Sequence, residues 1–195
     1  MNNCVRGYAP LPDDRGYELA EGDVVTVSLG VHIDGYAVIS SQTIHVQLSP
    51  SPALGPVADA VCALHYAVKG IINELSTGSM AQVHDILREA MDIFGVSVVQ
   101  GSTLRRIRRF LVGQSTIEEL DGKAIDVSLP VSNAELSVLP GEVYLLDLAV
   151  STGSGMVTPQ GFTRRLIGRL ENTQIYAQRY IPAQSLAQNA TQTSN

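Results

Sequence analysis

The chain has 195 residues, of which 45% are hydrophobic and 16% charged, and its formal net charge is −6 at pH 7. This length can bury one sizeable core, so we expect one globular domain, and the composition is not that of a disordered segment. The acidic balance excludes a general nucleic-acid coat, and no apolar run is long enough to cross a bilayer. We expect a soluble intracellular protein with two reduced cysteines, Cys4 and Cys62.

Charge is distributed unevenly along the sequence. Residues 1–100 contain four Lys/Arg and eleven Asp/Glu, whereas residues 101–195 contain nine and eight. The basic residues concentrate in one run, which consists of Arg105, Arg106, Arg108 and Arg109. The sequence therefore predicts one local basic patch on an acidic protein.

The first predicted elements are strands. A short strand is expected over residues 2–10. Apolar and polar residues then alternate from Val25 to Ile33, which is the period of a half-buried strand. The Asp34-Gly35 pair is a strong turn signal, so residues 36–46 are predicted to return as the second strand of a hairpin.

Two helices are predicted after the hairpin. Apolar residues recur at intervals of three and four from Val57 to Leu75, which places them on one helix face. A second apolar stripe extends from Met80 to Phe94 and stops at Gly95. Ser79 and Gln82 have the spacing of a capping box at its start.

Further strands are predicted at residues 96–99, 125–129 and 143–150. The order of elements indicates an α+β fold in which helices cover one side of an antiparallel sheet. The polar segment 183–195 has almost no apolar bulk, so it is predicted to be a mobile tail.

Common catalytic motifs are absent from the sequence. It has no P-loop, no HExxH, no GxSxG and no GxGxxG. The glycine-rich segment 151–155 follows a strand but lacks the lysine and the helix that phosphate binding requires, so a plain turn is predicted. His65 and His84 lie on the predicted helices and are interpreted as structural.

The arginine run has two interpretations. Its spacing places arginines on both faces of any strand, and the planar guanidinium suits phosphate oxygens, which favours contact with RNA. Alternatively, the run is a solvated charged face paired with the acids just downstream, Glu118, Glu119 and Asp121. Composition alone leaves both open.

Three segments resemble a known superfamily. They are Leu29-Gly30-Val31-His32-Ile33-Asp34-Gly35-Tyr36, the run GSTLRRIRRFLVGQ at 101–114, and the strand GEVYLLDL at 141–148. All three are similar to the methionine aminopeptidase superfamily, and the arginine run most resembles its fungal ribosome-export factors. The resemblance implies a pita-bread (creatinase/aminopeptidase-like) fold, with residues 1–182 as a partial domain of this type.

The resemblance also implies lost metal chemistry. Enzymes of this superfamily hold two metal ions with two aspartates, a histidine and two glutamates, and a further histidine assists the substrate. Matching the motifs places the assisting histidine at Gly7, the aspartates at Ile39 and near Pro50, the liganding histidine at Ser102 and one glutamate at Asp147. One carboxylate cannot hold two divalent ions, so we expect a pseudoenzyme with no metal or other cofactor.

An active aminopeptidase would need an alternative ligand set. It would consist of His32, Asp34 and His45. His32 and Asp34 flank the predicted tight turn, far from a pocket at the centre of a sheet, which disfavours this set.

The resemblance implies a partner-binding function. The expected role is a non-catalytic factor that binds the precursor of the large (60S) ribosomal subunit near the exit tunnel, contacts rRNA and ribosomal proteins there, and promotes nuclear export. Nucleoporin repeats and other assembly factors are expected partners, and no binding to a membrane is expected. The protein would be located in both the nucleus and the cytoplasm. Arg105, Arg106, Arg108 and Arg109 are the candidate rRNA-binding residues. A general RNA-binding regulator, similar to the proliferation-associated members of the superfamily, is the remaining alternative.

Overall fold

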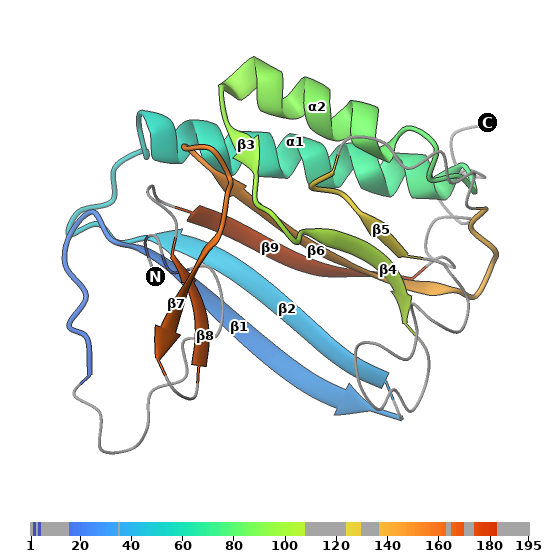
Figure 1. Ribbon diagram of the computed structural model, residues 1–195, viewed down its shortest axis with the longest axis horizontal. Coiled ribbons are helices and arrows are strands. Elements are labelled where there is room, and N and C mark those ends of the chain that lie inside the picture. Colours follow the sequence, from blue (N-terminus) through green and yellow to red (C-terminus); the bar gives the residue numbers. More distant parts are fainter. Residues whose placement is uncertain are drawn as a thin grey trace.

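The computed structural model has two layers, a twisted antiparallel sheet and a pair of helices. It describes Asn2, Cys4 and residues 16–34, 36–107, 124–129, 137–162, 165–169 and 174–182. Figure 1 shows both helices on one side of the sheet, with α1 between the sheet and α2. The predicted α+β class, with helices covering one side of an antiparallel sheet, is confirmed.

Seven strands form the main sheet, in the spatial order β1-β2-β9-β6-β4-β5, and β3 also pairs with β6. Their bounds are Val24–Ile33 for β1, Tyr36–His45 for β2, Ser97–Val98 for β3, Thr103–Ile107 for β4, Ala124–Asp126 for β5, Val143–Ser151 for β6 and Gln174–Pro182 for β9. The strands β7 (Thr158–Phe162) and β8 (Arg165–Arg169) form a separate two-stranded sheet. Two strands are shorter than predicted. The segment 96–99 contributes only β3, and the segment 125–129 overlaps only the end of β5.

The hairpin forms where the sequence predicted it. The β1–β2 register pairs Val24 with His45 and continues without interruption to Ile33 and Tyr36. Asp34 in the connecting turn has a φ of 48°, a left-handed conformation that Asp tolerates better than most residues. The turn therefore fixes which residues face each other along the whole hairpin.

The helices are α1 (Pro56–Ser76) and α2 (Val83–Phe94), and both were predicted. Gly95 ends α2 in the left-handed conformation with a φ of 63°, as the stop signal indicated. The predicted capping box is wrong, because Gln82 makes no side-chain cap and Ser79 instead accepts a hydrogen bond from the Ala81 amide. The buried Glu74 of α1 accepts the Gln82 amide at 3.2 Å, so a tertiary contact replaces the local cap.

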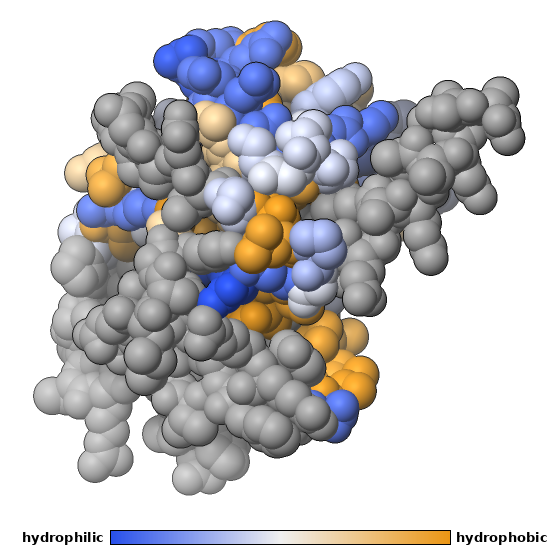
Figure 2. All heavy atoms as spheres, turned by 90° about the vertical axis from the view of Figure 1, so that its right-hand side faces the viewer, coloured by the Kyte–Doolittle hydropathy of each residue, from blue (hydrophilic) through white to orange (hydrophobic). Residues whose placement is uncertain are grey.

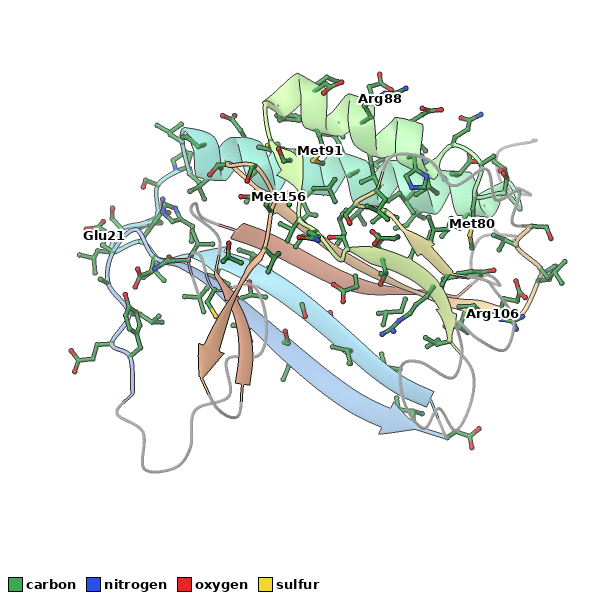
Figure 3. All side chains as sticks on the ribbon, viewed as in Figure 1. Glu21, Met80, Arg88, Met91, Arg106 and Met156 are labelled. Atoms are coloured by element: carbon green, nitrogen blue, oxygen red, sulfur yellow. The ribbon has the colours of Figure 1, made fainter. Side chains whose placement is uncertain are left out.

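The core lies between the helices and the sheet. Its fully buried side chains come from α1, from α2 and from the even-numbered residues of β6, and they include Ile71, Leu75, Val83, Leu146 and Leu148. Arg88 lies on the outer side of α2 and Met91 on the inner side (Figure 3). In the described part of the chain, neither helix is long and apolar enough to span a membrane.

The glycine-rich segment 151–155 is a structural turn, as predicted. Gly155 is buried and has a φ of 74°, and a Cβ built there would lie 2.2 Å from the Val98 carbonyl oxygen. Its own carbonyl accepts the Gln100 amide at 2.9 Å. The predicted strand at 2–10, apart from Asn2 and Cys4, and the predicted tail at 183–195 lie outside the described residues.

Asp23 joins the start of the hairpin to the preceding chain. Its carboxylate accepts hydrogen bonds from the Ala20 amide at 2.9 Å and from the Asn2 side-chain amide at 2.9 Å. These bonds, first the backbone one and then the one from Asn2, lower the pKa of Asp23 below its ordinary value.

The apolar face of the hairpin is open to solvent over much of its length. Val27, Leu29, Val31 and Ile33 share the strand face opposite to Ser28, and Leu29 is 72% exposed. Figure 2 shows a hydrophobic patch low on the molecular face it presents, in the region of the β1–β2 turn. The described helices therefore cover only part of the sheet.

The two helices meet at Gly70 of α1. A Cβ built on Gly70 would lie 2.5 Å from Cγ2 of Ile86 on α2, so the absence of a side chain allows the close approach. The contact helps fix α2 against α1.

We expect Gly70→Ala to destabilise the protein by about 1–3 kcal/mol, because the cost of overpacking exceeds the ~1 kcal/mol gain in helix propensity. Urea unfolding measures the change. In the Ile86→Ala background, where Cγ2 is absent, the same substitution should cost nothing or stabilise. Equal costs in both backgrounds would contradict this packing.

Candidate functional site

The candidate site is a row of residues that crosses the sheet on the face opposite the helices. The register pairs Ser28 of β1 with Ser41 of β2, Ser41 with position 178 of β9, position 178 with Asp147 of β6, and Asp147 with Thr103 of β4. Paired residues of antiparallel strands share a face. Because Leu146 and Leu148 point into the helix-side core, Asp147 and its row lie on the opposite face of the sheet. We call this the open face because the described helices do not cover it.

The row is polar at its described side chains. Ser41 and Asp147 are both 8% exposed, and the Oγ atoms of Ser28 and Ser41 are 2.7 Å apart in a hydrogen bond. Asp147 is the row's carboxylate in the middle of the sheet. A buried carboxyl group at that place distinguishes this row from the apolar core on the other face.

The three described positions that the resemblance singled out have different surroundings. Ile39 lies two residues from Ser41 and therefore on the same face as Asp147. However, β9 lies between β2 and β6, so the two strands are about 10 Å apart, and Ile39 is also displaced by two residues along its strand. Ser102 is fully buried, and its hydroxyl donates to the Val99 carbonyl at 2.8 Å and accepts the Ala149 amide at 3.1 Å. Its hydroxyl therefore holds the β3–β4 connection against β6.

Two further expected positions do not join the row. Pro50 is exposed and lies beyond the end of β2, in the segment that leads to α1, so it is not part of the row. Gly7 lies outside the described residues. A ligand position in the hairpin must be within a strand to face the sheet centre, which the loop at Pro50 cannot do.

The donors on this face do not fit a pair of divalent ions. Among the described residues, no three His, Cys, Asp or Glu side chains lie close enough together to hold a metal ion. Serine and threonine hydroxyls and an isoleucine cannot neutralise two dications that share a site, since such sites need several carboxylates or imidazoles. The chemistry of a dinuclear metallopeptidase therefore has no matching donor set on this part of the sheet.

The alternative ligand set is divided by the geometry of the hairpin. Asp34 lies in the exposed turn, and His45 is the last residue of β2, at the opposite end of the hairpin. At about 3.3 Å per residue along a strand, the two are about 30 Å apart. They cannot hold one ion together.

The arginine run divides between two faces, as its spacing predicted. Arg105 pairs with Leu145 and lies on the open face, whereas Arg106 pairs with Tyr144 on the helix side. Arg106 donates to Glu142, which also accepts the Tyr144 hydroxyl at 2.7 Å and the Leu139 amide at 2.9 Å. Figure 3 shows Arg106 at the end of β4, close to the start of β6.

Arg106 is therefore a structural residue within the run. The side chains of Arg106 and Glu142 are 14% and 10% exposed, so the ion pair is largely shielded from water. Of the four candidate rRNA-binding residues, Arg105 is the described one on the open face. Arg108 and Arg109 lie outside the described residues, and so do Glu118, Glu119 and Asp121.

Ser28, Ser41 and Thr103 were not among the site residues predicted from the sequence. A usable signal was present, because the Asp34-Gly35 turn sets a register in which Ser28 faces Ser41. The positions of β9 and β4 beside β6 could not be obtained in this way, since those pairings join distant parts of the chain.

This architecture is the pita-bread fold of methionine aminopeptidases. The methionine aminopeptidase of Thermotoga maritima aligns with a TM-score of 0.71 at 15% identity, over 93% of this chain and 68% of that one. A thermophilic Arx1 aligns with a TM-score of 0.72 at 15% identity, over 93% of this chain and 70% of that one. The profile of Metallopeptidase family M24 matches residues 1–115, and the chain belongs to this family.

Curated relatives are similar in sequence as well. The chain is 36% identical to "Probable metalloprotease arx1" of Schizosaccharomyces pombe over 78% of this chain and 46% of that protein. It is 32% identical to "Proliferation-associated protein A" of Dictyostelium discoideum over 80% of this chain and 39% of that protein. It is also 32% identical to the "Curved DNA-binding protein" of Schizosaccharomyces pombe over 88% of this chain and 45% of that protein. The chain spans about half the length, or less, of these relatives.

We expect Arg106→Met to destabilise the protein by about 3 kcal/mol, because it leaves Glu142 shielded from water without its cation. Arg88→Met removes the same charge from the exposed outer side of α2 and serves as the matched control, with a change of about 0.5 kcal/mol or less. Chemical unfolding of both variants measures the difference. Equal stabilities would show that the ion pair contributes nothing.

Proposed function

We propose that this protein is a non-catalytic ribosome biogenesis factor that binds the precursor of the large ribosomal subunit near its exit tunnel and promotes its nuclear export. It would shuttle between nucleus and cytoplasm, with rRNA, ribosomal proteins, nucleoporin repeats and assembly factors as partners. The observation that carries the proposal is the row across the sheet centre, where the described donors do not fit a metal pair. A fold kept without the donors of its chemistry is best explained by binding.

The relatives support the same direction. Several are named Arx1, and the fold is shared with a solved Arx1. The relatives are also named probable metalloproteases, so an active aminopeptidase is the enzymatic alternative. Arg105 on the open face of β4, with Arg108 and Arg109 next in sequence, supplies the guanidinium groups that would contact rRNA phosphates.

Metal content separates the binding protein from the enzyme. We expect the purified protein, after incubation with cobalt or manganese and gel filtration, to retain far fewer than the about two ions per chain of a dinuclear site. Elemental analysis measures the ratio, and a methionine aminopeptidase treated identically is the positive control. Two retained ions together with release of methionine from a methionyl peptide would establish an enzyme.

Ribosome binding can be tested by reversing charges in the arginine run, with melting curves as the check on folding. We expect the triple substitution of Arg105, Arg108 and Arg109 by Glu to reduce co-sedimentation with large-subunit precursors, because it removes the guanidinium groups that would contact phosphates. Arg106 is left unchanged so that its pair with Glu142 stays intact. If each arginine contacts one phosphate, the slope of log affinity against log salt should fall by about one for each arginine removed.

The matched control for that experiment is Arg88→Glu on the outer side of α2, which changes the same charge on a different surface. Co-sedimentation that is equal for wild type, triple variant and control at moderate salt would exclude the arginine run as the contact.

A general nucleic-acid-binding regulator is a second candidate function. The similarity to proteins named proliferation-associated protein and curved DNA-binding protein favours it. It differs from the first candidate in one observable respect, because a general binder should hold free structured RNA as tightly as the intact precursor particle. Gel-shift titration with deproteinised rRNA decides between them.

A further inference from the structure

A hollow lies on the helical layer, away from the sheet and its polar row. It has a volume of about 460 Å³ and is lined by residues of both helices, which are Tyr66 of α1 and Ile86, Glu89, Ala90, Ile93 and Phe94 of α2. We call it the α1–α2 groove. Its size is within the range of about 300–1,000 Å³ that is usual for binding sites.

The groove presents apolar side chains that the core does not use. Ile93 is 68% exposed and Tyr66 is 60% exposed, whereas α2 packs inward through Val83, Leu87 and Met91. The ring of Tyr66 stacks on that of Phe94, with centroids 5.7 Å apart and an angle of 25° between the planes. The two stacked rings, partly held by the helices, form a preorganised apolar wall.

The unpaired charges that α2 presents at the groove are negative, and Lys69 of α1 is the exposed cation one turn after Tyr66. Glu89 is part of the lining, and Asp92 is exposed one turn later on the same helix. Arg88, the basic residue of α2, is already paired with Asp85 at 2.7 Å. Within the described residues, Glu89 and Asp92 have no ion-pair partner, so a cationic ligand would meet unneutralised carboxylates.

We propose that the α1–α2 groove docks a basic amphipathic helix of a partner protein. Apolar anchors spaced at i and i+4 on such a helix would pack against Tyr66, Ile93 and Phe94, and lysines or arginines flanking them would face Glu89 and Asp92. Nucleic acid is disfavoured as the occupant, because its phosphates would face these same carboxylates. The groove lies on the opposite side of the sheet from Arg105, so the two surfaces can be tested separately.

The test uses a fluorescent synthetic peptide of about 18 residues, with Leu and Phe at i, i+3, i+4 and i+7 and Lys at the other positions, so that one face is apolar. A second peptide has every Lys replaced by Glu. Fluorescence anisotropy with the full chain should show micromolar binding of the Lys peptide, weakening as salt rises, and binding of the Glu peptide about tenfold weaker or more.

Two groove variants and two matched controls locate the site. Ile93→Ser removes an exposed apolar anchor and Glu89→Lys reverses a lining charge, and each should weaken the Lys peptide about tenfold. The controls are Leu54→Ser, an apolar residue 82% exposed outside the groove, and Glu21→Lys, which lies below the helices near the start of β1 (Figure 3). Both controls should bind as wild type does, and unchanged melting curves show that all four variants fold.

The exposed Cys62 of α1 provides an independent way to locate the bound peptide. It lies one helical turn before Tyr66 and so on the same face. In a Cys4→Ser background it is the single thiol, and a photo-crosslinker attached there should capture the Lys peptide.

Three results would each overturn the proposal. They are failure of the Lys peptide to bind, equal binding by wild type and the two folded groove variants, and direct binding of a labelled single-stranded RNA oligonucleotide that Ile93→Ser weakens. The arginine variant could lose ribosome co-sedimentation and still bind the peptide. That result would support the groove as the peptide site and would bear only on the β4 surface.

Discussion

The structure depends on the burial of β6. Eight of its nine residues are buried, and it pairs with β9, β4 and β3, so the positions of these strands are fixed relative to it. Alternate residues enter the helix-side core, where Leu146 and Leu148 are inaccessible to water. Asp147 must then point to the other face. One buried strand therefore separates a hydrophobic layer from a polar row.

The polar row explains why membership of a metallopeptidase family need not mean peptidase chemistry. Divalent ions are held by several charged or imidazole donors, and the described side chains of the row are serines, threonine and one aspartate. The row is nevertheless polar and includes a buried carboxyl group, that of Asp147. Adjacent arginines in β4 illustrate the division, because Arg106 pairs with Glu142 on the helix side while the half-buried Arg105 lies on the opposite face.

The two faces differ in the sign of their charge. The open side of β4 carries arginine, whereas the outer helix α2 carries carboxylates around exposed apolar residues. Under the two proposals, the protein contacts RNA with one side and a basic polypeptide with the other, since each surface repels the ligand of the opposite one. Ribosomal particles contain both kinds of ligand.

Local sequence determined the hairpin, both helices, the end of α2 at Gly95 and the strand β6, because each depends on periodicity or on a turn residue within a few positions. It also determined that the arginines of β4 occupy both faces. Tertiary structure decided which arginine is paired, since Glu142 is 36 residues from Arg106. It likewise replaced the predicted cap of α2 by Glu74, assembled the row around Asp147 and formed the α1–α2 groove. These features join residues distant in the chain, and strand pairing and helix packing alone bring them together.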